Sequence, residues 1–177
     1  MAEVKFHQVE SDEDKQQAGA LIREYLEGLN ERVQRDYGIE FDVEAMLVSD
    51  LSDADKFFPP GGRFYLAQYR GDTAGVGCLK KLEDGVGEIQ RMYVPPNFRG
   101  KGVGRAMLNH LIEDARLIGY RRLKLKSLKF LEVAHSLYRS VEFREIDPYT
   151  DNSMKSYQDA KNLDRYYSIT VFMEMIL

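Results

Sequence analysis

The sequence predicts a mixed α/β domain with a mostly antiparallel sheet of six or seven strands and helices on both of its faces. Two observations carry this prediction. Runs of alternating apolar and polar residues, typical of strands, are interspersed with segments whose apolar residues recur every three to four positions, typical of amphipathic helices. Three of the strand-like runs also follow one another with only short turns between them, which favours antiparallel pairing.

The composition indicates a globular chain, most simply one domain over residues 1–177. It is 44% hydrophobic and 31% charged, and its formal net charge of −4 argues against a general nucleic-acid binder. The single Cys78 excludes an intramolecular disulfide, and the three separated histidines, His7, His110 and His135, predict no metal site. No apolar run approaches the roughly 18 residues that span a bilayer, and no secretory signal precedes the domain. We therefore expect a cytoplasmic protein without a membrane or nucleic-acid partner.

The N-terminal part begins with a strand over residues 4–10 and a helix over 11–34, for which Ser11 or Asp12 would be the N-cap. A shorter second helix is expected over 42–51. The breaker "FPPGG" comes next, and "GD" and "EDGVG" supply turns within the segment that follows it. The three strand-like runs joined by these turns are residues 63–70, 73–83 and 87–94.

The C-terminal part starts with the glycine-rich stretch "FRGKGVGR", residues 98–105, and a long helix that ends at Gly119. The next elements are a strand, a helix and two strands, over residues 120–128, 130–141, 143–149 and 167–177. The crossovers around the long helix should make part of an otherwise antiparallel sheet parallel. The polar connection over 150–168 is long, so we expect it to be mobile or functional.

The glycine-rich stretch has features of a phosphate site. Its glycines alternate where the helix begins, so N–H groups and the positive end of the helix dipole would meet a ligand there. No Asp or Glu lies between Val94 and Asn109. The basic side chains of the stretch are Arg99, Lys101 and Arg105. A turn that glycine merely makes easy is the alternative, and neither a P-loop nor a Rossmann loop fits the spacing.

"RGKGVG" resembles the Arg/Gln-x-x-Gly-x-Gly/Ala pyrophosphate loop of the GCN5-related N-acetyltransferases, the GNAT superfamily. The resemblance extends over "GEIQRMYVPPNFRGKGVGRAMLNHLIEDARLIGYRRLKL", and "AHSLYRSVEFREI" is similar to the family's Ala-x-x-Leu-Tyr-x-x-x-Gly-Phe block. The order of the elements also agrees, so the resemblance covers most of the chain. It implies a GNAT-like fold and an N-acetyltransferase whose donor is acetyl-CoA.

The resemblance also implies which residues bind the donor. Loop amides would bind the pyrophosphate, and the preceding strand would pair through its main chain with the pantetheine arm. The corresponding positions are Met92, Tyr93, Val94, Arg99, Gly100, Lys101, Gly102, Val103, Gly104 and Arg105.

Two residues match catalytic positions of the family. Glu88 corresponds to the strand glutamate that some members use as a base, and Tyr138 lies where a phenol can donate to the departing thiolate. Glu88 could instead be a solvated strand residue, with a water chain as the base, and Tyr138 could simply pack in the core. Two positions depart from the family pattern: Leu131 replaces an Asn that bonds the cofactor, and Glu142 replaces the Gly before Phe143.

Five other side chains receive more ordinary interpretations. His110 is expected to be solvated, and His135 to lie at the surface, although it could approach the cofactor's nucleotide end. Cys78 is expected to be a small residue of the core. Lys124 and Lys126 alternate with leucines and are expected on a solvated or cavity-lining face.

The acceptor is the least defined partner. The resemblance places its pocket near residues 30–55 and 149–167, where carboxylates could hold a cationic amine or cap helices, and where the aromatic-rich segment 164–167 could line the pocket. The candidates are Glu40, Asp42, Glu44, Asp147, Asp151 and Asp159. We favour a small-molecule or amino-acid-like primary amine. The alternatives are a protein lysine or N-terminal acetyltransferase and a catalytically weak acyl-CoA-binding regulatory module. The apolar last strand could be the edge of a homodimer or an internal strand.

Overall fold

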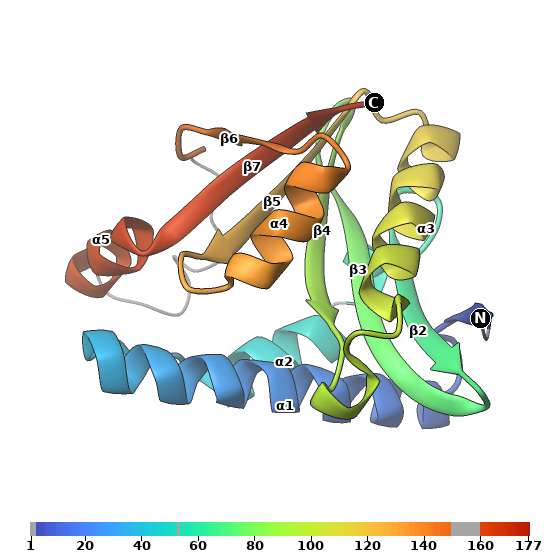
Figure 1. Cartoon of the computed structure of the whole chain (residues 1–177), viewed down its shortest axis with the longest axis horizontal. Helices are drawn as coiled ribbons and strands as arrows, with labels where there is room; N and C mark the ends of the chain where they lie inside the picture. Colours follow the sequence, from blue (N-terminus) through green and yellow to red (C-terminus); the bar gives the residue numbers. More distant parts are fainter. Residues whose placement is uncertain (1–2, 53, 150–159) are drawn as a thin grey trace.

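A computed structural model describes residues 3–52, 54–149 and 160–177, and they form a seven-stranded sheet flanked by helices (Figure 1). The strand order is β1-β2-β3-β4-β5-β7-β6. Neighbouring strands are antiparallel except β4 and β5, which are parallel, so the predicted mixed and mostly antiparallel sheet is confirmed. The strands are β1 (Val4–Gln8), β2 (Arg63–Tyr69), β3 (Asp72–Glu83), β4 (Val86–Tyr93), β5 (Arg122–Leu128), β6 (Arg144–Ile146) and β7 (Thr170–Ile176).

The described part of the chain contains five α-helices: α1 (Asp12–Tyr37), α2 (Val43–Ser52), α3 (Val103–Ile118), α4 (Glu132–Ser140) and α5 (Ala160–Ser168). Ser11 is the N-cap of α1. Its hydroxyl accepts a hydrogen bond from the Asp14 N–H at 3.1 Å, and the Asp14 carboxylate accepts one from the Ser11 N–H at 2.9 Å. The helix ends at Gly38, whose φ of 62° is in the left-handed region.

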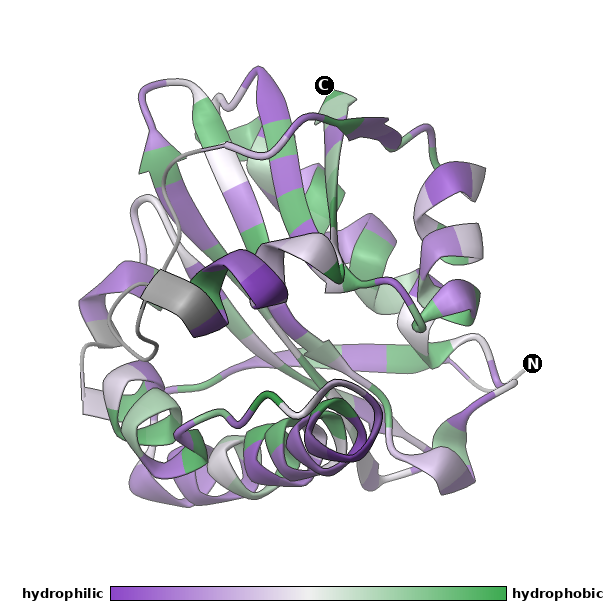
Figure 2. Ribbon diagram, turned by 90° about the vertical axis from the view of Figure 1, so that its left-hand side faces the viewer, coloured by the Kyte–Doolittle hydropathy of each residue, from purple (hydrophilic) through white to green (hydrophobic). Residues whose placement is uncertain are grey.

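Two apolar cores lie on opposite faces of the sheet. The α1–α2 pair covers one face and α3 with α4 covers the other (Figure 1). Successive strand side chains point to opposite faces, and the strands accordingly alternate between hydrophilic and hydrophobic residues (Figure 2). In β3, for example, Cys78 belongs to the α1–α2 core and Leu79 to the α3–α4 core.

In the C-terminal part, one element was not expected, and one of the two alternatives for the last strand is confirmed. Helix α5 lies within the segment that we predicted as an irregular connection, whose residues 150–159 are outside the described ranges. The last strand, β7, pairs with both β5 and β6, so it is an internal strand and not the edge of the sheet. In the described residues, no helix combines the length and the apolar character that a membrane span requires.

Candidate active site between two separating strands

Strands β4 and β5 separate halfway along their length (Figure 1). They pair only from Val86 opposite Arg122 to Ile89 opposite Leu125. Beyond this point β4 pairs only with β3, and β5 only with β7. The main-chain groups of β4 that face the gap therefore have no strand partner, and they can bond an extended ligand.

A β-bulge accompanies the separation. The register of β4 against β3 shifts between the Cys78–Gln90 and Val76–Tyr93 pairs. Within the shift Arg91 has a φ of 51°, a left-handed conformation that is uncommon for a residue with a side chain. Because a bulge bends its strand and increases the local twist, it helps to turn the end of β4 away from β5.

A cavity of about 70 Å³ lies in the gap. Since a buried water needs roughly 10–15 Å³ of such space, the cavity holds a few water-sized groups. Its walls come from α1, α2 and the segment before it, β4, β5 and α5, and they are formed by Tyr25, Leu26, Leu29, Phe41, Met46, Ile89, Gln90, Arg91, Lys126, Ser127, Leu128 and Tyr166. Among these residues only Arg91 and Lys126 carry a charge at neutral pH.

The glycine loop joins the end of β4 to α3. Gly100 and Gly102 have φ values of 73° and 83°, and a Cβ built on either would meet nothing within 4 Å. The two glycines are therefore required by backbone conformation and not by packing. Gly104 differs, because its φ is not positive and a Cβ there would lie 3.7 Å from Leu137 and 3.8 Å from Val94, which is ordinary contact. No side chain caps α3 and no acidic residue occupies its first turn.

The basic side chains of the loop are exposed, and only some of their N–H donors form hydrogen bonds with the described residues. Lys101 donates a hydrogen bond to a carbonyl of the preceding turn at 2.8 Å, and Arg105 is exposed on the first turn of α3. The Val103 side chain is buried in the core, so only its main chain can contact a ligand. The arrangement leaves first-turn amides and three cationic side chains around one helix start.

The predicted pantetheine contacts lie where β4 has left β5. Met92 and Tyr93 end β4, and Val94 follows them. The Val94 carbonyl accepts a hydrogen bond from Arg99 Nε at 3.0 Å. The Tyr93 hydroxyl donates to Glu24 of α1 at 2.7 Å, and the Arg99 guanidinium of the loop lies over the Tyr93 ring, 5.8 Å from its centroid. The main chain of this segment has no partner in β5, so the predicted pairing with the pantetheine arm stays a prediction.

Tyr138 lies on α4 with 7% of its surface exposed. Burial raises the pKa of its phenol, and the nearby Tyr25, which lines the cavity, raises it further. None of the described residues forms a hydrogen bond with the Tyr138 hydroxyl. Tyr138 is not among the residues that line the cavity, although Tyr25, which does line it, is close enough to influence the phenol.

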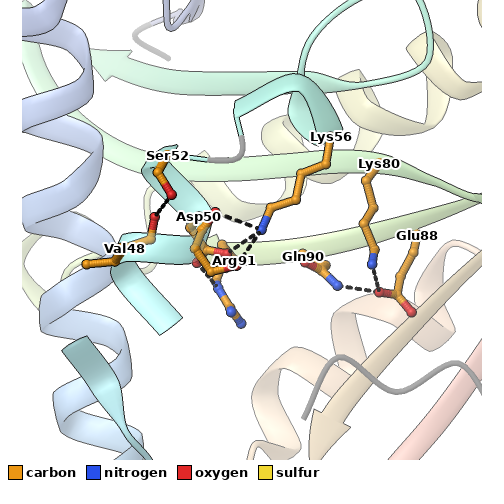
Figure 3. Close-up of polar contacts among 9 residues, drawn as sticks. Val48, Asp50, Ser52, Lys56, Lys80, Glu88, Gln90 and Arg91 are labelled. Carbon is orange, nitrogen blue, oxygen red and sulfur yellow. Dashed lines mark hydrogen bonds and ion pairs between the residues drawn. The ribbon is translucent and has the colours of Figure 1, made fainter. Parts of the chain in front are cut away.

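Glu88 lies on β4 and is fully buried, which excludes a solvated strand residue (Figure 3). The Tyr149 hydroxyl donates to Glu88 Oε2 at 2.6 Å, and the Gln90 amide donates to the other oxygen. Lys80 Nζ lies 3.8 Å from Oε1 and Lys126 Nζ lies 3.6 Å from Oε2. Gln90 and Lys126 both line the cavity, so the carboxylate is one side chain away from it.

The two departures from the family pattern have visible consequences. Leu131 occupies the N-cap position of α4, and no side chain caps that helix. Glu142 has a φ of 76°, so the left-handed turn before Phe143 is kept although a glycine is missing. A residue with a side chain therefore holds a left-handed conformation that glycine would adopt without strain.

The surface position expected for His135 is wrong, whereas His110 keeps 32% of its side chain exposed. His110 stacks on Phe6 with ring centroids 4.3 Å apart, and His135 is 4% exposed with its Nε2 3.0 Å from Ser127 Oγ. Burial lowers the pKa of His135, and the charge of Arg139 lowers it further. Cys78 is fully buried in the core, as expected. Within the described ranges, no three His, Cys, Asp or Glu side chains are grouped as metal ligands.

The described members of the carboxylates predicted for the acceptor pocket do not line the cavity. Asp42 accepts a hydrogen bond from the Ala45 N–H at 2.9 Å and so caps α2, and Glu44 pairs with Arg23 of α1. Glu40 and Asp147 are exposed, whereas Asp151 and Asp159 lie outside the described residues. Three residues of the predicted segments do line it: Phe41, Met46 and Tyr166.

The sequence analysis missed a buried ionic cluster next to the cavity, which includes the cavity-lining residue Arg91. Asp50 of α2 is 2% exposed, and its Oδ2 accepts a hydrogen bond from Arg91 Nε at 2.6 Å while Lys56 Nζ lies 3.3 Å from Oδ1 (Figure 3). One signal was available, because Asp50 follows the buried Met46 by four residues and so lies on the apolar side of its helix.

The sequence model of the Acetyltransferase (GNAT) family matches residues 26–143. The chain belongs to this family. Within the GNAT match lie the cavity-lining parts of β4 and β5, the glycine loop and Tyr138. Family membership therefore confirms the resemblance inferred from the loop and from the Leu-Tyr block.

Curated relatives agree with this assignment. The "Uncharacterized N-acetyltransferase YjgM" of Escherichia coli is 31% identical over 121 residues, which are 66% of this chain and 72% of that protein. The "N-acetylaspartate synthetase" of Xenopus tropicalis is 33% identical over 107 residues, which are 59% of this chain. The match spans only 40% of that relative's length.

Solved structures agree in fold. An acetyltransferase of the GNAT family from Staphylococcus aureus has a TM-score of 0.72 at 17% identity, and the match covers 99% of both chains. A Bacillus subtilis acetyltransferase, solved in complex with CoA, has a TM-score of 0.64 at 17% identity and covers 100% of this chain and 99% of its own.

Proposed function

We propose that this GNAT domain, over residues 1–177, transfers the acetyl group of acetyl-CoA to a primary amine of a small molecule or amino-acid-like acceptor. The observation that carries the proposal is the gap between β4 and β5, because it opens toward an uncapped helix start at one end and a cavity at the other. The CoA bound by the Bacillus subtilis structural relative supports the donor. The buried, unpaired Cys78 fits a reducing compartment, and we propose the cytoplasm.

The donor would bind along the gap. Its pyrophosphate would meet the amides from Gly100 to Gly104, where the positive end of the α3 dipole favours an anion. Arg99, Lys101 and Arg105 would add positive charge around it. The pantetheine arm would pair with the main chain of Met92 to Val94, whose gap-facing groups lack a strand partner.

The reaction needs a neutral amine. An alkyl ammonium has a pKa near 10.4, so fewer than about one molecule in a thousand is neutral at pH 7. Arg91 and Lys126 line the cavity, and nearby positive charges lower the pKa of a bound ammonium. Glu88 would accept the proton through water, because its oxygens are occupied by Tyr149 and Gln90 and do not face the cavity directly.

Tyr138 would stabilise the departing thiolate. A thiol has a pKa of about 8.5 and a phenol about 10, and burial raises the phenol's value further. Full proton transfer to the thiolate is therefore uphill, whereas a hydrogen bond from the phenol to the developing sulfur anion is favourable. The attacking amine, the thioester and the phenol would act together in one ternary complex.

The test is a screen of amines for release of free CoA thiol, followed by the Tyr138→Phe variant. We expect turnover to fall by about ten- to a hundredfold while the dissociation constant of CoA stays unchanged, because only the hydroxyl is lost. Tyr37→Phe, which removes a hydroxyl on α1, is the matched control. Unchanged turnover in Tyr138→Phe would refute the role of the phenol, and CoA binding without transfer to any amine would refute the enzyme.

A further inference from the structure

Ser127 and His135 form a buried polar pair beside the cavity. Ser127 lines the cavity from β5, and His135 lies on α4 with its Nε2 3.0 Å from Ser127 Oγ. Only 8% of Ser127 and 4% of His135 is exposed. The function proposed above uses neither residue, although a hydroxyl in contact with an imidazole is an arrangement that can move a proton.

Two elements hold the Ser127–His135 pair in place. Ser127 lies two residues beyond Leu125, the last residue of β5 that pairs with β4, and its main chain pairs with Val171 of β7. It therefore lies where the gap has opened, on a strand that is still fixed on its other side. His135 and Tyr138 are buried on α4, three residues apart. Because such residues share a face of a helix, the pair lies beside the phenol that is proposed to contact the thiolate.

The imidazole of His135 is surrounded by opposing charges. Burial lowers its pKa, and the charge of Arg139 on α4 lowers it further. The groups that raise it are Glu145 of β6, Glu132 of α4 and a main-chain hydrogen bond with Leu128 of β5. The lowering prevails, so the ring is mostly neutral at pH 7.

A neutral ring can accept a proton from the hydroxyl. In the tautomer with its proton on Nδ1, the imidazole of His135 accepts at Nε2, which is the nitrogen that lies beside Ser127 Oγ. A serine hydroxyl has one proton to donate and two lone pairs to accept with. Ser127 can therefore donate to the ring and accept from a ligand in the cavity at the same time.

Acetyl transfer removes two protons from the acceptor nitrogen. The ammonium loses one before it attacks, and the nitrogen must lose a second after it has bonded to the carbonyl carbon. The function proposed above gives the first proton to Glu88 through water, and it assigns Tyr138 only a hydrogen bond to the sulfur. It assigns no group to the second proton.

We propose that Ser127 is a further catalytic residue, which takes the second proton from the attacking nitrogen and passes its own proton to His135 Nε2. The proposal rests on the N-acetyltransferase function given above. One N–H bond and the Oγ–H bond break, and a new Oγ–H bond and an Nε2–H bond form. The carbonyl then re-forms as the C–S bond breaks, and the electron pair of that bond leaves with the sulfur. His135 acts through Ser127, so it is a positioning residue.

The same path restores the pair. The imidazolium returns its proton through Ser127 to the CoA thiolate, which leaves as the thiol. This transfer is downhill, because a thiol has a pKa of about 8.5 and the pKa of His135 lies below its ordinary 6.5. The phenol of Tyr138 then needs to donate only a hydrogen bond.

Two variants test the pair. Ser127→Ala removes the hydroxyl, and His135→Gln keeps a side chain that can bond it but cannot take its proton. We expect each to lower kcat by about a hundredfold and to leave the dissociation constant of CoA unchanged. The double variant should lose little more than either single one, because both interrupt one path. Ser127→Thr restores a hydroxyl and should recover most of the rate. Ser136→Ala and His7→Gln change exposed residues and are the matched controls.

The pH dependence distinguishes this role from a structural one. Deprotonation of the amine gives log(kcat/KM) a slope of about one against pH in every variant. The wild-type slope should become steeper below about pH 6.5, where His135 gains a proton and can accept no other. His135→Gln should keep the slope of the amine alone. Equal slopes in the two proteins would overturn the proposal, and so would a His135→Gln variant that loses stability but no kcat.

The remaining outcomes separate this proposal from the function beneath it. After incubation with acetyl-CoA and no amine, mass spectrometry should find Ser127 without an acetyl group, because it only moves a proton. An acetylated Ser127 would make it a nucleophile and overturn the proposal. Unchanged kcat in Ser127→Ala overturns it too and leaves the N-acetyltransferase intact. Binding of CoA without transfer to any amine overturns both.

Discussion

Gly102 and Gly104 are only two residues apart, yet the structure predicts opposite results when each is changed to alanine. Gly102 has a φ of 83°, and nothing lies within 4 Å of a Cβ built on it. An L-residue in the left-handed region costs roughly 1–2 kcal/mol, so Gly102→Ala should lower the free energy of unfolding by about that amount. In a domain of this size about 1 kcal/mol corresponds to roughly 2–4 °C in Tm.

Gly104 lies in the first turn of α3 with ordinary backbone angles, and its added Cβ would make contacts of 3.7 and 3.8 Å. Gly104→Ala should therefore raise the free energy of unfolding by about 0.4–1 kcal/mol, because it removes conformational freedom from the unfolded chain. The two variants carry the same added methyl group, so each is the control for the other.

Affinity for CoA provides the second measurement. The empty space beside Gly102 is where the proposed pyrophosphate approaches the amides, so Gly102→Ala should weaken CoA binding by at least about tenfold. Gly104→Ala should change it only a few-fold. Urea unfolding and isothermal titration of CoA measure both quantities. Equal effects of the two variants on CoA affinity, or unchanged affinity in Gly102→Ala, would refute the loop assignment.

Three further predictions follow from the described contacts. Glu142 has a φ of 76°, so Glu142→Gly should raise the free energy of unfolding by about 1 kcal/mol in urea titrations, and a loss of stability would show that the turn is unstrained. Burial lowers the pKa of His135 below its ordinary 6.5, so the unfolded chain binds a proton where the folded one does not. The wild-type protein should therefore lose stability as the pH falls below about 6.5, and His135→Gln should show a flatter slope between pH 5 and 8; identical slopes would contradict the buried neutral imidazole. Ser11→Ala removes the N-cap of α1 and should lower Tm through a loss of about 0.5–2 kcal/mol, whereas Ser11→Asp should retain most of the stability.

Most of the fold was predictable because its signals are local. The period of the apolar residues placed the strands and the first four helices, and the short turns at "GD" and "EDGVG" set the antiparallel order of β2, β3 and β4. Helix α5 was missed because its segment is polar and contains no apolar run that would indicate a helix. The pairing of β7 on both sides agrees with the internal strand that the sequence allowed, and β6 is shorter than the strand predicted over 143–149.

The candidate site was only half predictable. The glycine loop, the strand before it and Tyr138 each carry a local pattern, so their positions followed from the sequence. The burial of Glu88 and His135 did not, because each is covered by side chains from other elements: Tyr149 and Lys126 cover Glu88, and Ser127 contacts His135.

The sequence by itself determined the family, the order of the elements apart from α5, and the glycine loop before α3. These depend on backbone conformation and periodicity, which neighbouring residues set. Only the tertiary structure decided which residues line the cavity between β4 and β5. Of the acids predicted for the acceptor pocket, Asp42 caps α2 and Glu44 pairs with Arg23, and Arg91 contacts Asp50 across 41 positions of sequence. The lining of a site is assembled from residues that folding brings together, so no local pattern can give it.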